Sequence, residues 1–362
     1  MKSISIQRAN AVLLFGILTV FVLYIGRPFW VPLAFALLLC MLLEPVSRRI
    51  EGWGVSRFWA TILCILLILL FIGGFCGVIY AQAVSFSKDW PQIQPKLQQM
   101  LTTVQQWVQQ QFDMNPQEQV ESAKKGLKQL SQSASGSFTK FLSGFGTLLT
   151  SFVLILLYFF FLMWKREKFR EFLLRLFPAD RKTETRHALG QIAKVSAQYL
   201  GGRLISMLFL GVVYAIGFTI FGLKNALLMS VIAVIPTLIP YVGAFIGAAF
   251  PLFMALVSGS SDALLPTVAV IVVAQVIDNN IIEPLVMGSR LNLSPIFTII
   301  AIVVGELIWG IPGMILFEPL FAIIRIVCSH IPELHPYAFL LEDELEEPQW
   351  VQKVKKVFSG KS

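Results

Sequence analysis

Four polar residues stand together at positions 278–283 in an otherwise apolar stretch: Asp278, Asn279, Asn280 and Glu283. A charge near the centre of a bilayer is costly, so ionisable residues at membrane depth indicate a functional site. In an α-helix Asn279 and Glu283 would share a face, four residues apart. Such carboxylates and amides can coordinate a sodium ion, exchange a proton or hydrogen-bond a polar solute. The alternative is a helix end at the membrane surface, where Asp278 and Asn279 are merely hydrated.

Glu306 is a second ionisable candidate, flanked by Val304 and Leu307 just before a glycine- and proline-containing break. Free backbone carbonyls at such a break and a protonatable carboxylate predict an ion-coupling residue. A structural alternative is that Arg325 or Arg290 neutralises Glu306. Glu318 is interpreted in the same way.

Two apolar runs, 226–257 and 296–328, are too long to be simple membrane spans, which need about 20 residues. Helix-breaking residues lie inside both: Pro236, Pro240 and Gly243 in the first, and Gly310, Pro312 and Gly313 in the second. After the break each run continues with Pro-Leu-Phe. Paired interrupted segments of this kind indicate a transport site. We therefore predict two helical hairpins that meet near the middle of the membrane with 278–283 between them, although short apolar sequences can also match by chance.

The elements that carry these residues are predicted to be membrane helices. Of 362 residues 56% are hydrophobic and 14% charged, against roughly 25% charged in soluble domains. The sequence predicts an all-α polytopic membrane protein of about eight transmembrane helices. The candidate spans are 10–26, 29–46, 58–83, 146–164, 204–222, 226–257, 263–282 and 296–328.

The chain divides into four predicted regions. Residues 1–83 hold the first three helices, 84–145 form an extracytoplasmic amphipathic helical segment, 146–328 form a second transmembrane region, and 329–362 form a tail. Within the second region, 165–200 is predicted to be a cytoplasmic amphipathic segment that lies along the membrane as an interfacial helix. Lysine and arginine residues follow the second and fourth spans, so both chain ends are predicted to be cytoplasmic. The outer segment is interpreted as a solvated spacer or, alternatively, a capture domain.

Several functions are disfavoured. The net charge of +8 comes from residues flanking apolar runs, which orient helices in a membrane, so nucleic acid is not an expected partner. The four cysteines lie in apolar runs and are interpreted as small apolar side chains that pack between helices. Phosphate-binding and hydrolase motifs are absent from the sequence, so no catalytic residue, cofactor or metal site is expected. Arg27, Glu44 and Arg203 lie at the ends of predicted spans and are interpreted as structural.

The order and spacing of several motifs resemble the autoinducer-2 exporter (AI-2E) family. The motifs are Arg27-Pro28, Glu44-Pro45, Phe177-Pro178, Tyr199 to Gly202, Pro240 to Gly243, Asp278 to Gly288, Leu293 to Pro295 and Gly310 to Gly313. The resemblance implies a location in the bacterial inner membrane and a homo-oligomer, with a pentamer as one candidate. It also implies export of a small molecule such as autoinducer-2, whereas some relatives look like sodium- or lithium-proton antiporters. Glu318 departs from the family pattern, in which a small or apolar residue precedes the proline.

The most consistent interpretation is a secondary transporter that exports a small polar solute. Its expected partners are membrane lipids, the solute, a monovalent cation or proton, and further copies of the chain. Cation–proton antiport is the alternative within this class. A non-transporting scaffold is the alternative outside it.

Overall fold

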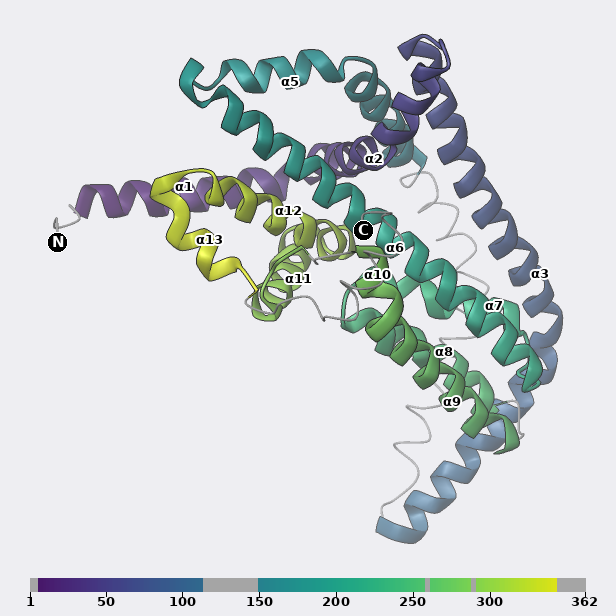
Figure 1. The fold of residues 1–362 in the computed structure, drawn as a ribbon. Helices are drawn as coiled ribbons and strands as arrows, with labels where there is room; N and C mark the ends of the chain where they lie inside the picture. Colours follow the sequence, from purple (N-terminus) through teal and green to yellow (C-terminus); the bar gives the residue numbers. More distant parts are fainter. Residues whose placement is uncertain (1–5, 113–148, 258–260, 288–290, 344–362) are drawn as a thin grey trace, which may run out of the picture. The chain divides into compact units, whose positions relative to one another are not determined.

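The computed structural model describes residues 6–112, 149–257, 261–287 and 291–343. These residues are almost entirely helical, with an isolated β-bridge between Leu293 and Glu342. The prediction of an all-α fold is therefore confirmed (Figure 1). The part of the predicted outer segment beyond Phe112, and the tail beyond Asp343, lie outside the described residues.

The chain forms two compact units, which are described separately. The first comprises residues 1–70, 153–206 and 278–362, and the second comprises 71–152 and 207–277. Two long helices, α3 (Arg57–Phe112) and α6 (Lys182–Ile220), contribute residues to both units.

The first unit begins with α1 (Ile6–Ile25) and α2 (Arg27–Gly52), which are joined at Gly26. The indole of Trp30 covers Gly26 so closely that a Cβ there would lie 2.6 Å from Trp30 Nε1. A second turn, with Gly54 at a φ of 87°, leads into α3. The α3 helix continues from the third predicted span to Phe112, so the first part of the predicted outer segment is helical.

The fourth span, Leu149–Trp164, bends by 71° into α5 (Arg166–Arg175). A short turn, η1 (Ala179–Arg181), then leads to α6. The segment 165–200, predicted to be an interfacial helix, is thus divided between α5, η1 and the first part of α6. Pro178 has an extended backbone and separates α5 from α6, and α6 continues unbroken from Lys182 through the predicted span. Gly201 lies within α6 and does not end the helix. A Cβ at position 201 would lie 3.5 Å from the side chain of Leu42, so the glycine makes room for it.

The first interrupted run folds, as predicted, into two helices with a break between them. They are α7 (Ala226–Val234), extended by η2 (Ile235–Leu238), and α8 (Val242–Val257), which is followed by α9 (Ser261–Ile277). Tyr241 has a positive φ of 59° at the break. A Cβ at Gly243 or Gly247 would overlap backbone atoms of Pro236 or Ala233, so the two arms meet backbone to backbone.

The second interrupted run is likewise broken, into α11 (Pro295–Trp309) and α12 (Ile311–Ser329), which lie side by side in Figure 1. Gly310 separates them with φ 66° and ψ −145°, a conformation open mainly to glycine. Pro312 lies in the first turn of α12, where its missing N–H does no harm. Gly305 and Gly313 face each other so closely that a Cβ on either would overlap the backbone of the other.

The carboxyl-terminal part of the described chain is fastened to the start of this hairpin. After η4 (Pro332–Leu334) and α13 (His335–Leu341), the N–H of Ser294 donates to the Leu341 carbonyl at 2.9 Å. The N–H of Asp343 donates to the Asn292 carbonyl at 3.2 Å. Glu342 Oε1 accepts hydrogen bonds from Asn292 Nδ2 at 3.0 Å and Arg325 Nη1 at 3.1 Å.

Among the described residues, five helices are long and apolar enough to cross a membrane, or six if the bent pair at 149–175 is one span. The five are Arg27–Gly52, Arg57–Phe86, Lys182–Ile220, Ala263–Val286 and Ile311–Ser329. Shorter apolar helices cover Leu13–Ile25, Ala226–Leu238, Val242–Val257 and Pro295–Trp309. The chain is thus a multi-pass membrane protein. Its first interrupted run consists of short helices, and its second combines the short α11 with α12, which is long enough to cross a membrane.

Candidate transport site

Helix α6 presents a row of buried polar side chains within an apolar sequence. Tyr199, Arg203 and Ser206 follow one another at intervals of four and three residues, so they share one face of the helix. Their exposed fractions are only 4%, 9% and 2%. Arg203, which was predicted to lie at the end of a span, stands in the interior of α6, because this helix begins at Lys182.

Ser206 contacts the first of the predicted site residues. Its Oγ lies 2.7 Å from each carboxylate oxygen of Asp278, so the hydroxyl proton is shared between them. Asp278 is 3% exposed, which agrees with the prediction of a buried carboxylate rather than a hydrated helix end.

The segment that holds Asp278 is a π-helical turn, η3 (Asp278–Ile282), between α9 and α10 (Glu283–Met287). Proline at 284 has no N–H to donate to the Asn280 carbonyl, and the helix widens here to the i→i+5 pattern. The predicted α-helical faces therefore do not hold. Asp278 turns inward, Asn279 and Asn280 are exposed, and Glu283 is partly buried.

Tyr199 connects α6 to a carboxylate on α12. Its hydroxyl donates to Glu318 Oε2 at 2.8 Å. Glu318 is partly buried and precedes the buried Pro319. Glu283 lies close enough to Tyr199 and Glu318 to interact with both electrostatically.

Arg203 lies between these two hydrogen-bonded pairs. It interacts electrostatically with Tyr199, Asp278 and Glu318. Its Nε is buried and has no hydrogen-bond acceptor among the described residues. We call the whole set the buried polar cluster: Tyr199, Arg203, Ser206, Asp278, Glu283 and Glu318.

The buried polar cluster contains three carboxylates and one guanidinium on membrane-spanning helices. Burying charges requires compensation by partners, protons or ions. The excess of carboxylates can take up protons or a monovalent cation, while the hydroxyls and the guanidinium can hydrogen-bond a polar solute. Groups of three or more acidic, histidine or cysteine residues that could hold a metal are absent from the described part of the chain.

Other predicted site residues stand apart from the buried polar cluster. The side chain of Glu306 on α11 is exposed, beside the exposed Val303 and Leu307. Its predicted neutralisation by Arg325 is wrong, because Arg325 pairs with Glu342, and Arg290 lies outside the described residues. The first break, with Pro236, Pro240 and Gly243, belongs to the second unit, and the break at Gly310 to Gly313 belongs to the first. Whether the two hairpins meet stays a prediction.

Sequence reasoning did not assign Tyr199, Ser206 or Arg203 to the site. The signal was present as polar residues spaced four and three apart in an apolar stretch, on the same face as Ser196 and Leu210. It was missed because the span was expected to begin at Leu204.

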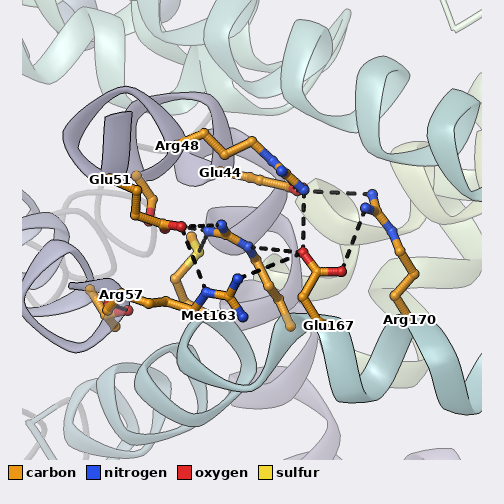
Figure 2. Close-up of polar contacts among 10 residues, drawn as sticks. Glu44, Arg48, Glu51, Arg57, Met163, Glu167 and Arg170 are labelled. Atoms are coloured by element: carbon orange, nitrogen blue, oxygen red, sulfur yellow. Dashed lines mark hydrogen bonds and ion pairs between the residues drawn. The ribbon is translucent and has the colours of Figure 1, made fainter. Parts of the chain in front are cut away.

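A separate group of charged residues lies where the ends of α2, the 149–164 helix and α5 meet the start of α3. Figure 2 shows this arginine–glutamate network, comprising Glu44, Arg48, Glu51, Arg57, Arg166, Glu167 and Arg170. Its shortest contact between two helices joins Arg166 Nη2 to Glu51 Oε2 at 2.7 Å. The two arginine-rich segments predicted to share one membrane side therefore contact each other.

The fold and the buried polar cluster are those of a multi-pass membrane protein with a polar site on its spanning helices, the class to which transporters belong. The profile described as "AI-2E family transporter" matches residues 13–333. The chain therefore belongs to the AI-2E transporter family.

Named relatives cover most of the chain. The "Putative transport protein YueF" of Bacillus subtilis (strain 168) is 28% identical over 326 residues, which cover 87% of each chain. The "Putative transport protein YrrI" of the same strain is 26% identical over 341 residues, or 88% of this chain and 94% of the relative. The "Putative permease PerM" of Escherichia coli (strain K12) is 26% identical over 317 residues, or 83% and 87%. These names agree with a role in transport and name no substrate.

Proposed function

We propose that this protein is a secondary transporter that exports a small polar solute, of the autoinducer-2 kind, through the buried polar cluster. The observation that carries the proposal is the burial of Asp278 on a π-helical turn, bound by Ser206 and electrostatically coupled to Arg203. A π-turn on a spanning helix is a frequent feature of functional sites. A buried polar group on a membrane-spanning helix is costly unless polar partners or cargo compensate for it.

The chemistry of the buried polar cluster supports a solute with hydroxyl or carbonyl groups. Carboxylates accept hydrogen bonds from hydroxyls, and the Arg203 guanidinium donates to oxygen atoms. The phosphate-binding loop of ATPases is absent from the sequence. We therefore propose a solute or ion gradient as the driving force, with a partner protein as the alternative.

The setting of this activity is part of the proposal. We place the protein in the bacterial inner membrane with both ends in the cytoplasm, as a homo-oligomer such as a pentamer. Transport rather than catalysis is the activity of each subunit.

Flux in proteoliposomes tests the proposal directly. Vesicles containing the wild-type protein should release preloaded autoinducer-2 faster than protein-free vesicles. Asp278→Asn should reduce the initial rate of release at least tenfold while the protein remains folded. The reason is that an amide carries no negative charge and does not bind and release a proton. Equal rates from Asp278→Asn and wild type would contradict a transport role for the cluster.

A second candidate, sodium- or lithium-proton antiport, is favoured by the excess of carboxylates over arginine in the cluster. The same vesicles, loaded with a pH-sensitive dye, distinguish it. A sodium or lithium gradient should then drive proton movement that depends on Asp278 and Glu318. A non-transporting scaffold would instead show no flux in either assay, with wild type or with Asp278→Asn, and would lose its role when residues 84–145 are deleted.

A further inference from the structure

We infer that Arg203 is a mobile internal cation of the transport site, which pairs alternately with Asp278 and Glu318 as the cargo binds and leaves. This inference rests on the proposed function and deepens it. It gives a working role to a residue whose position in the sequence favoured a structural one.

Arg203 lies on α6 between two residues that each bind a carboxylate. One turn before it, Tyr199 binds Glu318 on α12, and one turn after it, Ser206 binds Asp278 on η3. Each carboxylate is thus held by its own hydroxyl at about 2.7–2.8 Å, on a different element, with Arg203 between them. A guanidinium has several N–H groups in a rigid fork, so it can turn from one carboxylate to the other.

Arg203 is committed to neither carboxylate. Within the part of the chain that the structure describes, no ion pair within 4.0 Å and no hydrogen bond involves its side chain, and its Nε has no acceptor. Its interactions with Asp278 and Glu318 are electrostatic at longer range. Two partly buried arginines, Arg166 and Arg325, also have a buried Nε without a hydrogen-bond acceptor among the described residues. They differ from Arg203 in having an ion pair, Arg166 with Glu51 at 2.7 Å and Arg325 with Glu342 at 3.1 Å.

The cluster has three carboxylates and one guanidinium, so Arg203 can neutralise Asp278 or Glu318 but not both at once. The carboxylate that it leaves, like Glu283, must then be satisfied by a proton, a cation or the solute. Binding of cargo at one carboxylate therefore releases Arg203 to the other. Because Asp278 and Glu318 belong to different helices, this exchange connects site occupancy with the positions of η3 and α12.

Double-mutant cycles on thermal stability test the pairing without any transport assay. The variants are Arg203→Gln, Asp278→Asn and Glu318→Gln, alone and in the two pairs that contain Arg203→Gln. An arginine shared by both carboxylates predicts a non-additive shift in melting temperature for both pairs. Additivity in one pair would overturn the inference, because Arg203 would then be a fixed partner of the other carboxylate.

Transport by the same variants tests the role in the cycle, with autoinducer-2 and sodium-driven proton movement as the two probes. Arg203→Gln should lower the transport rate at least tenfold. Arg203→Lys should retain the positive charge and the fold, but it should recover little of the lost transport rate. The pairs should remain inactive, whereas a static counter-ion predicts that Arg203→Gln with Glu318→Gln recovers activity. Arg325→Gln is the control for removal of a partly buried arginine outside the cluster.

The outcomes separate the two proposals. If wild-type vesicles move neither probe, the proposed function fails, while the stability cycles still decide whether Arg203 is shared. If wild type transports and a charge-neutral double variant transports equally well, the function stands and the mobile cation is refuted.

Discussion

At the scale of single residues, the buried polar cluster illustrates how a membrane helix accommodates charge. Each buried carboxylate that contacts α6 accepts a hydrogen bond from a hydroxyl there, as Asp278 does from Ser206 and Glu318 from Tyr199. A hydroxyl satisfies a carboxylate oxygen without cancelling its charge. The carboxylates therefore keep the capacity to bind a proton, an ion or a solute.

Replacing Ser206 by alanine should measure how much its hydrogen bond to Asp278 contributes to the stability of the protein. Asp278 would lose the hydroxyl donor that lies 2.7 Å away, and we expect a loss of about 1–3 kcal/mol in the free energy of unfolding. The measurement is the thermal or denaturant midpoint of the purified protein in detergent. Ser196→Ala is the matched control on the same face of α6, because Ser196 Oγ is buried without a partner among the described residues. An equal loss in both variants would refute the importance of the bond.

At the scale of elements, the two broken runs depend on backbone-to-backbone packing. In membranes, small residues allow helices to approach closely enough for dispersion forces to act along the whole contact. Gly305 and Gly313 allow this close approach in the α11–α12 hairpin, and Gly243 and Gly247 allow it in the α7–α8 hairpin. The arms are thereby held together despite the missing hydrogen bonds at the breaks.

Gly305→Ala and Gly313→Ala should each disrupt the α11–α12 hairpin. The added methyl group would meet backbone atoms, which cannot turn away as a side chain can. We expect destabilisation at or above the ~1–3 kcal/mol typical of overpacking, measured as a lower melting temperature. Gly190→Ala on α6, where a Cβ meets nothing within 4 Å, should instead be neutral or stabilising by about 0.5–1 kcal/mol. Similar melting temperatures for all three variants would contradict the close packing.

The arginine–glutamate network joins helix ends in the same unit. Glu51→Gln leaves Arg166, whose side chain is 12% exposed, without its nearest anion, so we expect a loss of about 1–3 kcal/mol in stability. The control is Glu171→Gln, which removes an exposed pair with Arg175 one turn away on α5 and should change stability by less than about 0.5 kcal/mol. Chemical denaturation at low salt measures both. A larger effect of Glu171→Gln would show that burial does not govern these pairs.

At the scale of the whole molecule, orientation in the membrane is a prediction from charge. The contact between the basic segments after the second and fourth spans agrees with their being on one side. Green fluorescent protein fused after residue 362 should therefore fluoresce. Alkaline phosphatase inserted within 113–145 should be active, because it would reach the outer side. The reverse pattern would invert the proposed orientation.

Much of the architecture follows from the sequence because hydrophobicity and helix breakers act locally. The breaks at Gly310 and around Pro240, and the burial of Asp278, were predicted on that basis. The extent of α6 was not, since a helix that begins in a polar, charged segment gives no hydropathy signal at its start. The π-turn and the partner of Glu318 depend on contacts between distant segments, which a single sequence does not reveal.

The fastening of Asn292 and Ser294 to residues 341–343 has a consequence for biosynthesis. These contacts join the two ends of a chain segment that contains α11 and α12. They cannot form until Asp343 has been translated. Membrane helices can insert one after another as the chain emerges, but the base of this hairpin must wait for the later segment. Shortening the chain ahead of Leu341 would therefore leave the hairpin open at its base, and the defect would appear as rapid degradation by quality-control proteases.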